Sequence, residues 1–450
     1  MKIHAPVENH YTANNAGLVS GERLCMADSF QKRSYEKAFA GSRPLKYPHI
    51  GVYAGTGTSH SWLWFIDIFD RMGFHAVSIL DEFDVMAGRL DTLDVLAVSG
   101  GDTMAIAEAL GPIGAQQVAA FISSGGVYLG SCAGAYLVMN SSKPHLCDFN
   151  FAAVKITNLS KHLPSCRGMG HKFSMAYGCD YIFHPVREAV GLRLSGNSPF
   201  KGEPSFRAPL YGGPGMRVTQ GAQVLARYDC FTDKTLFLVE KQLAHETLIN
   251  TAAAVRVRKG DGCIYLFGPH FEHPHFLQAN RLVAEAIYWD LRPKPAAKRP
   301  WSEGIKPLST RDSSMLLLTL KRELSNSRIV ATGLEMLPVK WQIGAKIYEP
   351  EKLRVFLESM WRRLKPLEKN DRLFVAAETS QTLMADAAET TALLRRLKSD
   401  IDLGKDTRLL AGRLIHLLHR YSMSFLELYF RCVWQIGQSG EQIELPKCPR

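Results

Sequence analysis

Cysteine is sparse and irregularly placed in this chain of 450 residues. The nine cysteines form no CxxC pair, and their number is odd. A disulfide-stabilised secreted domain or a zinc ribbon needs paired or regularly spaced cysteines, so both classes are excluded. The same pattern predicts a reducing, cytoplasmic location.

Long apolar runs are also missing. No stretch of 18 or more uninterrupted apolar residues occurs, so we expect no membrane-spanning helix and no membrane partner. Residues 1–20 lack an apolar core of signal-peptide length, which argues against secretion through a cleaved signal. Hydrophobic residues still make up 46% of the chain and charged residues 22%, which is typical of globular domains and sufficient for a large core.

Acidic residues are too few to balance the basic ones. The chain has 54 lysines and arginines against 43 acidic residues, and residues 301–450 hold 24 and 18 of these. Such an excess is either a solvated surface or a face for nucleic acid or another acidic partner. Because no nucleic-acid-binding motif accompanies it, we expect no nucleic-acid partner and favour a solvated surface.

Short apolar segments alternate with helical patterns in the first third of the chain. Strands are predicted at 48–54, 75–80, 94–98 and 126–130, and turns rich in glycine follow several of them. This alternation indicates a doubly wound, mostly parallel sheet of flavodoxin-like type, with ligand sites beyond the carboxyl ends of the strands. Shorter strands between about 150 and 268 predict an antiparallel extension of the same sheet.

Four regions are expected along the chain. Residues 1–46 are polar and aperiodic and are interpreted as an arm, and 47–291 form the α/β domain. The segment 292–300 holds three prolines and four basic residues, which marks a linker. Residues 301–450 show successive amphipathic helices without a catalytic motif, so we expect a smaller, separate helical domain that could contact a protein partner.

The strongest chemical signal is Cys132, which directly follows a buried strand and precedes a helix. Gly130 and Gly134 flank it and allow a tight strand-to-helix turn that presents the side chain. The positive end of the following helix favours a thiolate. The backbone N–H of Ala133 can donate to a developing oxyanion. An inert buried thiol is the alternative, and we retain it for the other eight cysteines.

A base for this thiol is offered near the end of the last predicted strand. His270 and Glu272 are two residues apart, so both side chains share one face if the segment is extended. His273 and His275 compete for the same role, and the cluster is also compatible with a metal or with solvated histidines. Because no Cys/His pair supports a metal upstream, no metal and no other cofactor is expected.

Two glycines follow the third predicted strand, at Gly100 and Gly101. They allow the backbone to offer an amide to the nucleophile of a neighbouring strand. Gly-Gly-Asp is also ordinary turn chemistry, so this signal gains weight only from its position one helical crossover before Cys132.

Together these residues resemble the class I glutamine amidotransferase-like superfamily, which carries a G-x-C-x-G elbow and a later H-x-E. More narrowly, the chain looks like the amidotransferase-like domain at the N-terminus of eukaryotic-type biotin–protein ligases, which also occurs alone in bacteria. The resemblance covers roughly 48–291. The matching segments are 52–58, 100–102, 130–136 and 210–214.

The resemblance implies a Cys132 nucleophile with His270 as base and Glu272 as its orienting acid. It implies oxyanion or substrate contacts from a further set of residues, namely Gly100, Gly101, Ala133, Tyr211, Gly212 and Gly213. The substrate would then be a small-molecule or peptide-like amide.

Two departures and two rival interpretations accompany the resemblance. The Gly-Arg-Gly-Arg loop of the ligase catalytic domain is absent, so biotin ligase activity is not implied. Phe271 stands where glutaminases usually have proline, which questions glutamine as substrate. One rival is a non-catalytic module that binds a small ligand and contacts a partner through 301–450. The other is a peptidase of the dipeptidase E and cyanophycinase group, whose members have serine at the position of Cys132.

Overall fold

A computed structural model shows how the chain folds. Two predicted segments, the arm 1–46 and the linker 292–300 apart from position 292, lie outside the part of the chain that it describes. The described residues are 48–158, 163–164, 184–200, 202–219, 221–292, 306–343, 346–370 and 372–438.

Five parallel strands form one end of a large mixed sheet. They are β1 (Ile50–Tyr53), β2 (Val77–Leu80), β3 (Val95–Val98), β4 (Val127–Ser131) and β12 (Gly262–Phe267). Their spatial order is β12-β4-β3-β1-β2, and each neighbouring pair is parallel. This is the 2-1-3-4-5 order of flavodoxin-like folds. Every residue of these strands is buried, as expected for a parallel sheet covered on both faces.

The antiparallel extension continues the sheet beyond β12. Its strands are β11 (Ala252–Lys259), β9 (Ala222–Phe231), β6 (Val186–Leu194), β7 (Ser205–Leu210), β10 (Leu236–Phe237), β8 (Met216–Val218) and β5 (Val154–Ile156). β11 pairs with β12, and β9 and β6 follow outward in turn. The predicted fold class, a doubly wound sheet with an antiparallel extension followed by helices, is confirmed.

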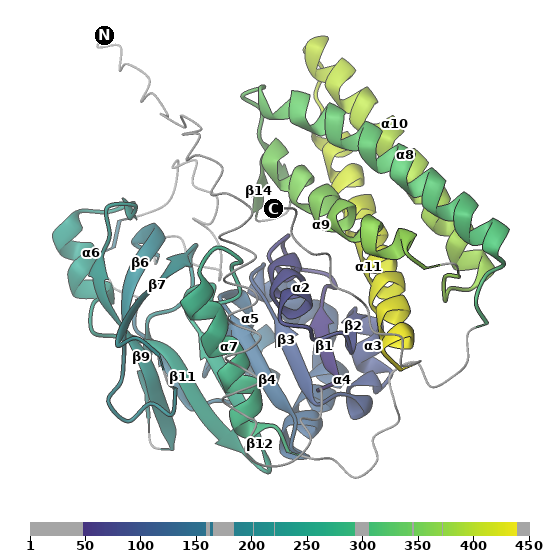
Figure 1. Cartoon of the computed structure of the whole chain (residues 1–450). Coiled ribbons are helices and arrows are strands. Elements are labelled where there is room, and N and C mark those ends of the chain that lie inside the picture. The colour runs from purple at the N-terminus through teal and green to yellow at the C-terminus, as the bar shows by residue number, and fades with distance from the viewer. Residues whose placement is uncertain are drawn as a thin grey trace, which may run out of the picture.

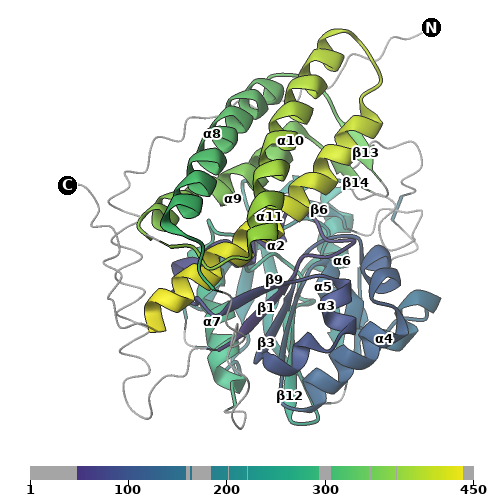
Figure 2. The ribbon, with the colours of Figure 1, turned by 90° about the vertical axis from the view of Figure 1, so that its right-hand side faces the viewer.

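Helices cover both faces of the sheet (Figure 2). One face carries α2 (Trp62–Arg71) and α7 (Leu277–Asp290). The other carries α3 (Glu82–Met86), α4 (Thr103–Ser123) and α5 (Ala133–Val138). Shorter elements are the 3-10 helices Arg89–Thr92 and Pro144–Phe149 and the helix α6 (Lys241–Leu248).

The helix α4 consists of two helical pieces with a break between them. Gly111, at φ 56° and ψ −170°, breaks the helical backbone just before Pro112, which explains why the sequence pattern changes there. Among the described helices, α4 alone is long and apolar enough for a membrane span by length and composition. It connects β3 to β4 and packs its apolar side chains against the sheet.

The C-terminal region is helical, as predicted, but it also contains a small hairpin. Its helices are α8 (Thr310–Glu335), α9 (Pro350–Glu368), α10 (Ala377–Asp402) and α11 (Arg408–Gln438). Between α8 and α9, β13 (Trp341–Ile343) pairs with β14 (Lys346–Tyr348). Figure 1 shows α9 and α11 nearest to the sheet and α8 and α10 farther away.

The helical region packs directly on the α/β part. One hydrophobic cluster extends from β1 and α2 into all four C-terminal helices. The buried guanidinium of Arg363 pairs with Asp67 and Asp70 of α2, each at 3.0 Å, and Tyr429 donates to Asp70. Glu427 accepts the backbone N–H of Ile79 on β2, the edge strand of the sheet. Whether residues 301–450 fold by themselves therefore stays a prediction.

Candidate active site

A sharp turn between β4 and α5 carries Cys132. The strand ends at Ser131 and the helix begins at Ala133. The backbone angles of Cys132, φ 52° and ψ −107°, lie in a region that residues with side chains rarely adopt. Such strain amounts to about 1–3 kcal/mol and clusters at functional sites. The partly exposed thiol lines a cavity beyond the strand ends.

The glycines on either side of Cys132 are required by close backbone contacts. A Cβ atom at Gly134 would lie 2.0 Å from the carbonyl oxygen of Val98 on the neighbouring strand. A Cβ atom at Gly130 would lie 2.5 Å from the carbonyl oxygen of Gly134. Both contacts are far shorter than atoms allow, so the small residues of the motif serve the turn itself.

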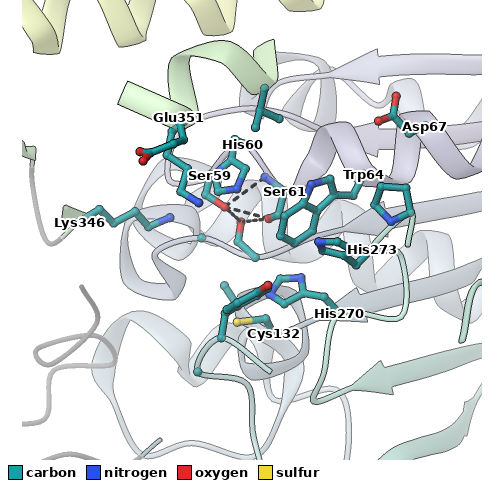
Figure 3. Close-up of a pocket in the computed structure, with 18 of the residues that line it drawn as sticks. Ser59, His60, Ser61, Trp64, Asp67, Cys132, His270, His273, Lys346 and Glu351 are labelled. Carbon is teal, nitrogen blue, oxygen red and sulfur yellow. Dashed lines mark hydrogen bonds between the residues drawn. The ribbon is translucent and has the colours of Figure 1, made fainter. Parts of the chain in front are cut away.

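His270 and Glu272 follow β12 and reach the same turn. The Nδ1 atom of His270 lies 2.7 Å from Oε1 of Glu272, and both side chains are buried. The thiol of Cys132 lies close enough to the His270 ring to help raise its pKa. Figure 3 shows the thiol beside this ring. The structure thus brings the three predicted residues together, with His270 hydrogen-bonded to Glu272 and next to Cys132.

The charge state of His270 is set by these neighbours. Burial alone lowers the pKa of a histidine, because it disfavours the charged ring. The negative charge of Glu272, its hydrogen bond to the ring and the nearby Cys132 act in the opposite direction and prevail, so the pKa of His270 is raised to about 10. The imidazole therefore holds a proton strongly at neutral pH.

Two serine hydroxyl groups fix the carboxylate of Glu272, and sequence reasoning missed both. Ser99, at the end of β3, donates to Oε1 at 2.7 Å, and Ser131, at the end of β4, donates to Oε2 at 2.7 Å. With His270, three groups hold a carboxylate that is fully buried. The signal was present, since each serine directly precedes a predicted site residue at a strand end.

The other two histidines of the cluster do not reach the thiol. Burial, followed by the positive charges of His275 and His270, lowers the pKa of His273 to about 3, so its ring is neutral. Its ring packs instead on Trp64, with 4.5 Å between centroids. Burial also lowers the pKa of His275. Within the described part of the chain, no group of three or more His, Cys, Asp or Glu residues is arranged to hold a metal ion.

Gly100, Gly101 and Ala133 line the cavity together with Cys132. A Cβ atom at Gly100 would lie 2.6 Å from the His270 ring, so glycine is needed to admit that ring. Gly101 lies opposite Thr58 in an isolated antiparallel bridge. The two backbone hydrogen bonds of this bridge are made by the residues on either side of Gly101 and Thr58, not by the pair itself. In such a pair the N–H of Gly101 points away from the loop at Thr58 and toward the side where β4 lies.

Two residues of the stretch Tyr211 to Gly213 line the cavity, and the third packs behind its wall. Tyr211 lines the cavity, and its ring centroid is 5.7 Å from that of His270. Gly212 lines it too and accepts a hydrogen bond from the Tyr136 hydroxyl group through its carbonyl. Gly213 is not among the lining residues; it packs against Gly268, whose carbonyl oxygen would be 1.7 Å from an added Cβ atom.

The α/β segment is similar to a known protein family. The family model described as biotin-protein ligase, N terminal, matches residues 50–292, which is more than half of the chain. The chain belongs to this family. The match confirms the narrower resemblance inferred from the sequence, to the N-terminal domain of biotin–protein ligases.

Other comparisons give weaker likenesses. A glutamine amidotransferase from Thermotoga maritima is 12% identical, and the match covers 71% of this chain and 95% of that one, with a TM-score of 0.29. A β-galactosidase from Bacillus circulans sp. alkalophilus is 11% identical over 58% of this chain, with a TM-score of 0.29. The matched part spans only 35% of the galactosidase. No curated protein sequence matches the chain.

The cavity extends beyond the segment that matches the biotin-protein ligase N-terminal family, because residues of the C-terminal region also line it. Its volume is about 730 Å³. The strand ends and Trp64 of α2 form one side, where the Trp64 ring stands at 90° to the His270 ring with 5.1 Å between centroids. The other side comes from the C-terminal region, through Lys346 and Tyr348 of β14 and Glu351 of α9. No sequence motif marked these residues.

Proposed function

We propose that this protein is a thiol-dependent, amidotransferase-like hydrolase that acts on an amide or related acyl bond. The observation that carries this proposal is the position of the Cys132 thiol, on a strained turn, beside the ring of His270, which is hydrogen-bonded to Glu272. A nucleophile in contact with a base, and a base held by an acid, is the arrangement that covalent acyl transfer needs.

The chemistry follows from these contacts. His270 already holds the proton that it shares with the thiol at neutral pH, so the sulfur of Cys132 attacks the carbonyl carbon of the amide without a further proton transfer. The oxyanion that forms accepts hydrogen bonds from the N–H of Ala133 and from that of Gly101 or Gly100. One such donor contributes about 3 kcal/mol to transition-state stabilisation. The C–N bond then breaks, and the leaving amine takes the proton from His270.

The second half of the reaction restores the enzyme. Water attacks the thioester while His270 accepts one of its protons. The C–S bond breaks, the carboxylic acid leaves, and the proton returns to the sulfur of Cys132. Glu272 keeps the His270 ring oriented and stabilises its positive charge throughout, and its own position is fixed by Ser99 and Ser131.

Binding without turnover is the second candidate, and the construction of the cavity favours it. The wall contributed by β14 and α9 connects a ligand in the cavity to the C-terminal helices. A sensor that reports a small ligand to a partner through the helical region would need this connection. It would not need Cys132 to form an adduct.

Alkylation with iodoacetamide tests the reactive thiol. The exposed Cys147 and Cys230 serve as internal references for an ordinary thiol, and the buried Cys263 as an unreactive one. Peptide mapping after short exposure at pH 6.5 is expected to show Cys132 modified at least about tenfold faster than the exposed references. Equal rates at Cys132 and Cys147 across pH would refute the activated nucleophile.

Acyl transfer is tested with p-nitrophenyl acetate. A burst of nitrophenol followed by slow turnover, with an acetyl group found on Cys132 by mass spectrometry, is the result expected for the enzyme. A reactive thiol that never carries an acetyl group would favour the binding module instead.

A further inference from the structure

Lys346 brings a buried positive charge into the cavity from outside the family segment. It is the first residue of β14, and the residue is 8% exposed. Figure 3 shows it extending from the hairpin toward Ser59, with Cys132 and His270 below it. The C-terminal region therefore places a charged group across the cavity from the reactive turn.

The ammonium group of Lys346 has little to bind within the protein. Its Nζ atom donates to the carbonyl oxygen of Gly57 at 3.4 Å, which is a long hydrogen bond for a group with three donors. Within the described residues, no carboxylate lies within ion-pair distance of it. The carboxylate of Asp102 is more distant and accepts two backbone N–H groups at the start of α4.

Other cations on the cavity wall have partners. Arg362 pairs with Asp67 at 3.4 Å, and Arg354 pairs with Glu335 of α8. Arg71 donates to the carbonyl oxygen of Pro274 at 3.0 Å. A buried charge without an ion pair is unfavourable in the folded protein unless a ligand completes it. Burial accordingly lowers the pKa of Lys346 to about 8.

We propose that Lys346 binds a carboxylate group of the substrate, which makes the substrate an amide or acyl compound with a negative charge near the scissile bond. This inference rests on the proposed function and names its substrate class. A single ammonium group matches a group with one negative charge, whereas a phosphate calls for several donors or a guanidinium fork. The helical region would then determine specificity.

The experiment compares two alkylating agents of nearly equal size, iodoacetate and iodoacetamide, on the full-length protein. Each alkylation rate at Cys132 is measured by peptide mapping. The ratio of the iodoacetate rate to the iodoacetamide rate is then compared among three proteins: wild type, Lys346→Met and Lys352→Gln. Lys352 also lines the cavity, so its substitution removes the same charge from the same wall. Cys147 supplies the ratio for an exposed thiol in every sample.

Loss of a direct contact is expected to lower the ratio at Cys132 about tenfold in Lys346→Met and much less in Lys352→Gln. Lys346→Arg is expected to retain part of the preference for iodoacetate. An unchanged ratio in Lys346→Met overturns the proposal, and so does an equal fall in Lys352→Gln, which would indicate a general field.

Failure of the proposed function gives a different result. The iodoacetamide rate alone reports whether Cys132 is reactive, and the ratio can be read even when both rates are slow. A structural role for Lys346 is separated by thermal unfolding. Removal of an unpaired buried charge is expected to leave the midpoint unchanged or higher, whereas a fall in Lys346→Met would show that the residue serves the fold.

Discussion

The α/β segment 50–292 and the helical segment 306–438 contribute to one cavity in different ways. In the first, the ends of neighbouring parallel strands bring Cys132, Ser99 and the glycines together, so the backbone fixes which residue types fit. In the second, a short hairpin and one helix supply a wall of the cavity. There the backbone geometry does not require particular residue types. Under the proposed function, reaction chemistry belongs to the family segment, while the helical segment shapes what enters the cavity.

The largest loss of activity is expected when the Cys132 thiol of the family segment is removed. Cys132→Ala is expected to lower the acyl-transfer rate by a factor of roughly 10³ or more, since no other group can form the covalent intermediate. The burst with p-nitrophenyl acetate measures this. Thermal unfolding should be little changed, and Cys147→Ala, at an exposed site, should leave both properties unaltered. Retention of the burst in Cys132→Ala would place the chemistry elsewhere.

The carboxylate behind the base should matter nearly as much. Glu272→Gln keeps the shape of the side chain but removes the charge that raises the pKa of His270. A loss of roughly 10²–10⁴-fold in turnover is expected, because neutralising the acid of a Ser-His-Asp triad has an effect of this order. NMR titration of His270 should show its pKa lowered in the variant. An unchanged pKa of His270 in this variant would contradict the proposal that Glu272 stabilises the charged ring.

Docking of the helical segment depends on Arg363. Arg363→Met leaves the buried carboxylate of Asp67 and the partly buried carboxylate of Asp70 without their shared partner, and a loss of about 3–5 kcal/mol in the free energy of unfolding is expected. Arg408→Gln, which breaks an exposed pair with Asp406, should change it by less than about 1 kcal/mol. Urea unfolding of both variants measures the difference. Similar small effects would mean that the two segments are only loosely joined.

The contrast between the segments also explains what the sequence could predict. Cys132 was recognisable because its turn demands small neighbours, and the parallel sheet followed from alternating buried segments. Ser99 and Ser131 were not recognised as partners of Glu272, because a serine at a strand end is equally at home in an ordinary turn. Lys346 could not be found, since a three-residue strand within a helical pattern leaves no periodicity to read.

The raised pKa of His270 predicts how stability depends on pH. A folded-state pKa of about 10, against the ordinary value of 6.5, means that the folded protein holds a proton that the unfolded chain releases. The stabilisation is fully present below pH 6.5 and is lost as pH rises through about 10. Urea unfolding of Cys132→Ala and of Cys132→Ala with His270→Gln isolates this group from the thiol. The first should lose stability more steeply above pH 7, over a narrower window than wild type because Cys132 no longer helps to raise the pKa of His270, and parallel curves would contradict the assignment.

The smallest expected effects come from the two serines that hold Glu272. Ser131→Ala and Ser99→Ala each leave one carboxylate oxygen with one donor fewer in a buried site, at about 1–3 kcal/mol of stability each. Ser99 donates to the oxygen that also contacts His270, so its loss should disturb the ring and lower turnover more than the loss of Ser131. The measurements are urea unfolding and the p-nitrophenyl acetate burst on both variants. Ser198→Ala, away from the cavity wall, is the control for a serine removed elsewhere. Equal turnover in Ser99→Ala and wild type would mean that Glu272 is positioned by His270 and Ser131 alone, and that β3 contributes only its glycines to the site.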